Sequence, residues 1–187
     1  TEGLLDLTGN TSIDLSNASF DSNAQMTFDG TSDSALVGTL GGYSNNMTVE
    51  AVFKTSSGAT WKNILCGSTG DIIFTVNGTK LNFGSQGSNP IPHANYSTTN
   101  VNDGQWHHGV ATYDGAQVKI YVDGILESTT ARTGNQTPSS LRVGSNNAGT
   151  SEFFNGDLPL VKLYNRALTV SEVQSNFNNY KTRFNIA

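Results

Sequence analysis

The chain has 187 residues and a formal net charge of −5, and charged residues make up only 13% of it. Because no stretch is strongly basic, the composition argues against a nucleic-acid partner. No apolar run approaches the ~20 residues that a membrane-spanning helix needs, so no membrane insertion is expected. The sequence does not begin with Met and shows no signal peptide, which suggests a fragment, a mature product or one domain of a larger protein.

The length fits a single domain, 1–187, and the many Asn, Ser, Thr and Gly residues favour short strands joined by polar loops. The first stretch, 1–24, is polar and weakly patterned. The next clear signal is Met47–Lys54, which alternates as a strand with one buried face does. Its predicted inward side chains are Met47, Val49, Ala51 and Phe53, and its predicted outward ones are Thr48, Glu50 and Lys54.

Most of the remaining chain also predicts strands. A hairpin is indicated by Asn77-Gly78, and a block of three strands at 106–130 is divided by Asp114-Gly115 and Asp123-Gly124. Residues 84–102 predict a long polar loop. Pro159, inside a late strand, indicates an edge position or a bulge. The other predicted strands are 25–28, 35–40, 63–66, 71–76, 80–83, 141–143 and 153–164.

The C-terminal stretch predicts one short helix that runs to about Lys181. Thr169 followed by Glu172 fits a capping box, and Val173, Phe177 and Tyr180 have the spacing of one apolar helical face.

Two central motifs carry a family resemblance. Asp103-Gly-Gln-Trp-His-His-Gly-Val-Ala, followed by Ile120-Tyr-Val-Asp-Gly, resembles the signature of concanavalin A-like lectin/glucanase domains, in particular the laminin-G-like and pentraxin-like branch. Residues 28–33 resemble the early turn of that family, and residues 154–168 resemble its late strand. The ending, 168–184, resembles such domains in bacteriophage structural and tail-associated proteins.

The resemblance implies an all-β fold: an antiparallel, two-sheet jelly-roll β-sandwich with a short C-terminal helix. In it, Trp106 would be a core anchor. The family often begins with a further strand, which 1–24 matches weakly, so either the fragment starts late or another chain completes the sheet. The resemblance also implies a possible Ca²⁺ site, with Asp33 as the candidate ligand. Alternatively, Asp29 and Asp33 only form hydrogen bonds that stabilise the turn.

The pattern of acidic residues argues against a glucanase. Glucanases of this fold carry carboxylates at alternating positions of one strand, and no glutamate here has an aspartate two residues later. His107 and His108 are neighbours on a predicted strand and point to opposite faces, so they cannot chelate one metal together; one is expected to face the core and the other to be exposed. We therefore expect a protein that is not an enzyme, although carboxylates from separate strands could still form a hydrolase site.

Sugar binding needs an aromatic platform and polar partners. Trp61 and Tyr96 lie in polar, loop-like surroundings and are the candidate carbohydrate-binding residues, unless each only closes the edge of the core.

Three hypotheses follow. The first is a non-catalytic, lectin-like surface module that binds a glycan or cell-surface polysaccharide, outside the cell or on a virion. The second is a structural or decoration protein that oligomerises, or packs with other virion proteins, without binding sugar. The third is a divergent glycoside hydrolase or lyase.

Overall fold

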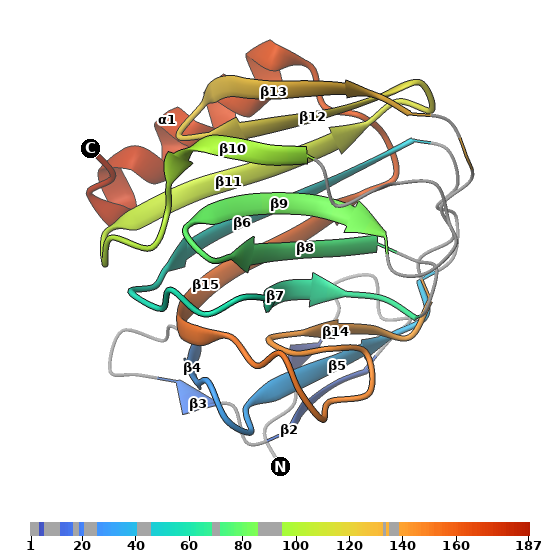
Figure 1. Cartoon of the computed structure of the whole chain (residues 1–187), viewed down its shortest axis with the longest axis vertical. Helices are drawn as coiled ribbons and strands as arrows, with labels where there is room; N and C mark the ends of the chain where they lie inside the picture. Colours follow the sequence, from blue (N-terminus) through green and yellow to red (C-terminus); the bar gives the residue numbers. More distant parts are fainter. Residues whose placement is uncertain are drawn as a thin grey trace.

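The computed structural model describes residues 4–5, 12–16, 19–20, 26–40, 46–68, 72–85, 95–132, 134 and 139–187. Within these residues the strands form two antiparallel sheets, and one helix follows the last strand (Figure 1). The all-β prediction with a C-terminal helix is confirmed. No described helix is long and apolar enough to cross a membrane.

The eight-stranded sheet has the order β1-β2-β5-β14-β7-β8-β9-β10. The bounds of its strands are β1 (Leu4–Leu5), β2 (Ser12–Ser16), β5 (Ser34–Gly38), β14 (Leu141–Val143), β7 (Lys62–Cys66), β8 (Ile72–Asn77), β9 (Lys80–Ser85) and β10 (Asn95–Asn100). The weakly patterned N-terminal stretch thus contributes strands to the sheet, because β2 pairs with β5.

The seven-stranded sheet has the order β13-β12-β11-β6-β15-β4-β3. Its strands are β13 (Ile125–Ala131), β12 (Gln117–Val122), β11 (Trp106–Tyr113), β6 (Met47–Lys54), β15 (Asn155–Tyr164), β4 (Met26–Asp29) and β3 (Ser19–Phe20). The turn between β12 and β13 has positive φ at both Asp123 (50°) and Gly124 (76°), as the predicted Asp-Gly hairpin requires.

The main core lies between the two sheets. Phe154 packs edge-on against Phe28 and Phe53, with ring centroids 6.3 and 6.5 Å apart. Val118, Ile120 and Val122 point into this core, as their alternation predicted. Each fully buried side chain of this kind contributes about 1.5–3 kcal/mol to the free energy of unfolding.

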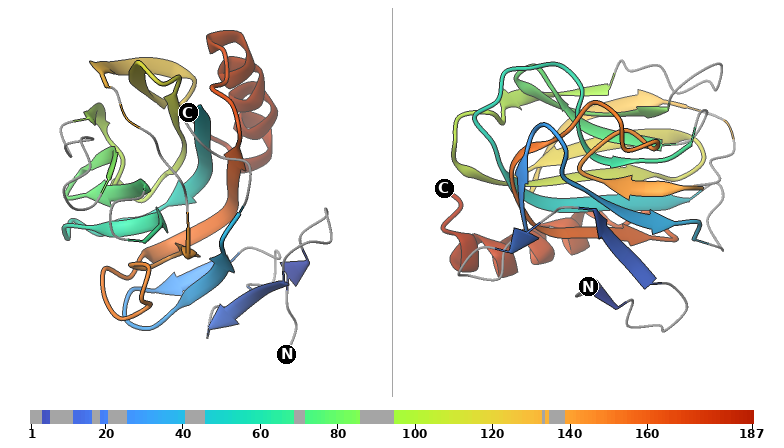
Figure 2. Two further views of the ribbon diagram at one scale, coloured as in Figure 1. Left: turned by 90° about the vertical axis from the view of Figure 1, so that its right-hand side faces the viewer. Right: turned by 90° about the horizontal axis from the view of Figure 1, so that it is seen from below.

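A third layer covers the outer face of the seven-stranded sheet. Helix α1 (Val170–Phe184) lies along this face, on the side away from the eight-stranded sheet (Figure 2, left). Its apolar face is the predicted one: Val173 packs with Val110 and Tyr121, whereas Phe177 and Tyr180 pack in a second cluster with Val52 and Phe184. Trp106, expected to be a core anchor, packs against this second cluster under the helix, where it is half-buried, and not in the core between the sheets.

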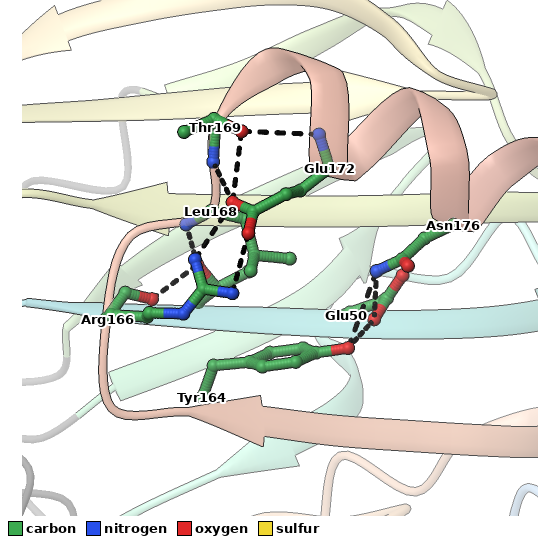
Figure 3. Close-up of polar contacts among 8 residues, drawn as sticks. Glu50, Tyr164, Arg166, Leu168, Thr169, Glu172 and Asn176 are labelled. Carbon is green, nitrogen blue, oxygen red and sulfur yellow. Dashed lines mark hydrogen bonds and ion pairs between the residues drawn. The ribbon is translucent and has the colours of Figure 1, made fainter.

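Polar contacts also hold the helix in place (Figure 3). Thr169 and Glu172 form the predicted capping box, and the Arg166 guanidinium donates to Glu172 at 2.7 and 2.8 Å. The bonds from Arg166, and then those from Thr169, lower the pKa of Glu172 to about 2. Below the cap, Asn176 of α1 donates to the Oε2 atom of Glu50 on β6 at 3.2 Å.

The helix explains why β6 is buried on both faces. The alternation of Met47–Lys54 predicted one buried face, but Thr48 and Glu50 are also fully buried. Thr48 accepts from the Leu168 amide and donates to the Arg166 carbonyl, both at 2.9 Å, on the segment that leads into α1. The prediction was wrong for these outward positions because periodicity cannot show that a third layer covers them.

Of two further predictions, the first needs correction and the second is confirmed in one of its two alternatives. Residues 84–102 are not a continuous loop, because the polar segment Asn95–Asn100 forms β10 beside β9. Its pairing is reinforced by side chains, with Asn82 donating to the Asn95 carbonyl at 2.9 Å. Pro159 is not on an edge strand, because β15 lies between β6 and β4. The predicted bulge is present instead, as a register shift between Asp157 and Leu160.

Candidate functional site

The outer face of the eight-stranded sheet carries a row of polar side chains. Asn63, Thr75, Asn82 and Tyr96 are direct cross-strand partners on β7, β8, β9 and β10. Their neighbours Phe74, Val76, Leu81 and Phe83 pack in the central core, so the row points to the outer face. In the part of the chain that the structure describes, no helix lies over this face, but Asn63, Thr75 and Asn82 are fully buried and only Tyr96 is partly exposed.

Tyr96, predicted from its polar surroundings, lies at the β10 end of the row. It is half-buried, and its hydroxyl accepts from Asn77 Nδ2 at 3.1 Å. It lies on a strand and not in a loop. The partly exposed phenol ring beside amide side chains is a combination that suits contact with a sugar ring.

Trp61 lies at the other end, two residues before Asn63, in the loop that joins β6 to β7. It is half-buried and has a φ of 56°, in the left-handed region that bulky residues seldom adopt. Such conformations concentrate at functional sites, where the surrounding structure holds them in place.

Glu152 completes this end of the row. Its carbonyl accepts from the Asn63 amide at 3.1 Å, and its carboxylate accepts from Asn63 Nδ2 at 2.7 Å. Its φ is 57°. Asn63 Oδ1 is buried and has no partner among the described residues, although buried acceptors are usually paired.

Asp33 lies apart from the row, in the turn between β4 and β5. It accepts the Asp29 amide at 2.9 Å, and burial raises the pKa of its carboxyl. Asp29 in turn accepts from Thr31 and from the Ser32 amide, and the bond from the Thr31 hydroxyl is the largest cause of its strongly lowered pKa. The two carboxylates thus stabilise the turn itself. Among the described residues no three His, Cys, Asp or Glu side chains form a metal-binding group.

The two histidines point to opposite faces as predicted, but neither is exposed. His108 is fully buried beneath α1, and its Nε2 lies 2.8 Å from Glu50 Oε1. His107 is 6% exposed, and its two ring nitrogens lie 2.8 Å from Asp123 and 3.2 Å from Asp103. Burial lowers the pKa of His107, but the two aspartates outweigh it, so the net shift is upward. With both nitrogens bonded to carboxylates, His107 connects two loops.

Each described glutamate forms hydrogen bonds with side chains or backbone groups that lie next to it in the fold. Glu50 bonds His108, Tyr164 and Asn176 under the helix. Glu127 accepts from Thr98 and Thr99 and so connects β13 to β10. Glu152 bonds Asn63, and Glu172 caps α1. No two of these glutamates lie on the same strand or on neighbouring strands, so they do not form the carboxyl pair, about 5–5.5 Å apart, that retaining hydrolysis uses.

Sequence reasoning missed three members of the row. Asn63, Thr75 and Asn82 are polar residues at alternating positions of otherwise apolar strands. This pattern would have placed them on the outer face, but the cross-strand register that aligns them depends on hairpin geometry. Glu152 carried no signal, because its contact with Asn63 joins segments far apart in the chain.

Comparison with known proteins agrees with this architecture. The family model of the concanavalin A-like lectin/glucanases superfamily matches residues 7–174. Domain 4 of AbnA, a GH43 extracellular arabinanase from Geobacillus stearothermophilus solved with arabinotriose, is similar with a TM-score of 0.71 and 18% identity over 92% of this chain and 91% of that domain. No curated protein matches the sequence.

Two larger proteins contain a similar region. The binding domain of botulinum neurotoxin serotype D has a TM-score of 0.69 and 13% identity, covering 94% of this chain and 49% of that one. Trypanosoma rangeli sialidase has a TM-score of 0.70 and 18% identity, covering 96% and 31%. This chain therefore spans about half of the toxin domain and about a third of the sialidase, and at these identities the likeness shows the fold alone. The chain belongs to the concanavalin A-like lectin/glucanase superfamily.

Proposed function

We propose that this domain is a non-catalytic carbohydrate-binding module that acts outside the cell or on a virion surface. The observation that carries the proposal is the pair of partly exposed aromatic side chains at the polar row of the eight-stranded sheet. Tyr96 is the partly exposed member of the row, and Trp61 lies two residues before its buried member Asn63. Aromatic rings and amide groups on one face provide both stacking surface and hydrogen bonds.

The similar structures support a glycan as the partner. The AbnA domain was solved with arabinotriose. For botulinum neurotoxin type C, another similar structure, cell entry is described as dependent on interaction with two ganglioside molecules. The absence of catalysis is part of the proposal and rests on the local contacts that occupy the described glutamates.

The test is a glycan panel that contains arabinotriose, linear gluco- and galacto-oligosaccharides and ganglioside headgroups, read by titration calorimetry. We expect at least one glycan to bind, and Trp61→Ala and Tyr96→Ala each to weaken it about tenfold, as loss of a ~1–1.5 kcal/mol aromatic contact would. Gln174→Ala, at an exposed position of α1, is the control. Unchanged affinity in both aromatic variants would exclude this face as the site.

Calcium is a separate part of the proposal, with Asp33 as the candidate ligand. Repeating the titration with chelator tests it. Loss of binding on chelation, reproduced by Asp33→Asn, would support a functional metal. Equal binding with and without chelator would mean that Asp33 only stabilises the turn.

A second candidate function is the structural one, in which the domain oligomerises without sugar. It is favoured by two exposed apolar side chains on the edge strand β13, Ile125 (67% exposed) and Leu126 (44%). Under this role, light scattering would show an oligomer that Ile125→Ser disrupts. The wild-type protein would also bind no glycan of the panel. A monomer would exclude this role.

A further inference from the structure

A pocket of about 200 Å³ opens where β6 ends and β15 begins. It is lined by residues 54–56, Gly104 and residues 155–157. Lys54 and Asp157 are cross-strand partners, so the pocket is built on two adjacent strand ends of the seven-stranded sheet (Figure 1). None of these residues belongs to the polar row.

Hydrogen bonds between the lining segments fix the walls of the pocket. The Thr55 hydroxyl donates to the Asn155 carbonyl at 2.7 Å, and the Gly104 amide donates to the Thr55 carbonyl at 3.0 Å. Gly156 has a φ of 137°, and a Cβ atom there would lie 2.1 Å from the Lys54 carbonyl oxygen, so only glycine fits. The shape of the pocket is therefore preformed by the fold.

Both charged groups of the lining keep hydrogen-bonding capacity. The Lys54 ammonium lies 5.7 Å from the centre of the Trp106 ring and forms no ion pair with a described carboxylate. Asp157 accepts the Thr27 hydroxyl at 2.9 Å through Oδ1, and the described residues leave Oδ2 available. A donor and an acceptor on one wall suit neighbouring hydroxyl groups, since each hydroxyl both donates and accepts.

The size of the pocket limits the occupant. Pockets for drug-sized ligands measure about 300–1,000 Å³, so this smaller one suits a single sugar ring and not a longer stretch of glycan.

The same two chain segments connect the pocket to the row. At the pocket, Thr55 contacts Asn155; at the row, Asn63 contacts Glu152. The segments 55–63 and 152–155 are therefore joined at both ends. Eight residue steps separate Thr55 from Asn63, a span of at most ~26–29 Å. Trp61 lies within this span and is partly exposed, whereas Asn63 is fully buried, so one oligosaccharide can reach from the pocket to Trp61.

We propose that this pocket binds the terminal sugar residue of the glycan whose following residues lie over Trp61. The inference rests on the proposed function. In this proposal the domain recognises the ends of glycan chains, and Asp157 and Lys54 form hydrogen bonds with hydroxyl groups of the terminal sugar residue.

The first experiment measures how many domains bind each polysaccharide chain. The probes are the best-binding linear oligosaccharide of the panel and size-fractionated polysaccharides of the same linkage. End recognition predicts a constant number of domains per chain as the chain lengthens. A number that rises in proportion to length would overturn the inference while leaving carbohydrate binding intact.

The second experiment changes the pocket. Ser56→Phe adds a ring at an exposed lining position, and Asp157→Asn removes the carboxylate charge; each should weaken the oligosaccharide at least tenfold. Ser175→Phe, exposed on α1, is the matched control, and an unchanged thermal midpoint shows that the variants fold.

The outcomes separate the two proposals. If Trp61→Ala abolishes binding but both pocket variants bind normally, the pocket inference fails and the proposed function stands. If wild-type protein binds no glycan, both fail. Saturation of the pocket by a free amino acid, with oligosaccharide binding unaffected, would also overturn the inference.

Discussion

The outer faces of the two sheets both carry polar side chains, but the surroundings of these side chains in the folded protein differ. On the seven-stranded sheet, Glu50 lies beneath α1 and bonds both His108 and Tyr164. Figure 3 shows its bond to Tyr164. On the eight-stranded sheet, Trp61 and Tyr96 remain half-buried with no described helix above them. Polar residues are buried on both outer faces, since Glu50 lies beneath α1 and Asn63, Thr75 and Asn82 are fully buried in the row. The helix joins its polar residues into one network, whereas the row leaves Tyr96 partly exposed as a candidate binding residue.

The largest expected effect is on the covered face. Glu50→Ala leaves His108 and Tyr164 buried without their shared acceptor, and removing one partner of a buried pair costs about 3–5 kcal/mol. Urea denaturation would measure the loss. Glu127→Ala at the edge of β13 is the matched control, with a smaller loss because water can replace its contacts. Equal losses would contradict the distinction between the two environments.

Acid should weaken the same network. Burial raises the pKa of Glu50, but the bonds from His108 and Tyr164 outweigh it and hold the pKa below its ordinary value of about 4.3. A lowered pKa means that the stabilisation is present above the unfolded-state pKa and is lost as pH falls through the folded one. The stability difference between wild type and Glu50→Gln should therefore shrink from pH 6 to pH 3. A constant difference would show that the charge of Glu50 is irrelevant.

A smaller effect is expected where the covering helix begins. Thr169→Ala removes the side chain that caps the Glu172 amide, a loss of about 1 kcal/mol. The midpoint of urea denaturation measures it, and Thr169→Ser should recover most of the loss. If the alanine variant were as stable as wild type, the contacts of Phe177 and Tyr180 would be sufficient to hold the helix.

The smallest stability effect is expected at the partly exposed Tyr96. Tyr96→Phe removes only the hydroxyl that accepts from Asn77, so the free energy of unfolding should change by no more than about 0.5 kcal/mol. Glycan affinity should fall severalfold if the hydroxyl bonds sugar, and calorimetry would measure it. A large loss of stability would instead place Tyr96 among the structural residues.

Much of the fold could be predicted because it rests on local signals. The strand at Met47–Lys54, the Asp123-Gly124 turn and the capping box at Thr169 were each predicted from neighbouring residues, and the structure contains all three. The strand at Asn95–Asn100 escaped prediction because its side chains are polar and its pairing comes from β9.

The candidate site was less accessible to prediction. Tyr96 is a member of the polar row and Trp61 lies two residues before its member Asn63, yet the row itself depends on the register of four strands. Asp33 lies elsewhere, in the turn between β4 and β5, where its carboxylate accepts from the backbone amide of Asp29.

The sequence by itself determined the all-β class, the main turns and the apolar face of the C-terminal helix, because period, turn chemistry and capping act over a few residues. Only the tertiary structure decided that Glu50 and His108 are buried, that Asn63 meets Glu152, and that Lys54 and Asp157 line one pocket. Each of these depends on segments far apart in the chain, and their meeting is set by sheet order and by the position of α1, which no local pattern encodes.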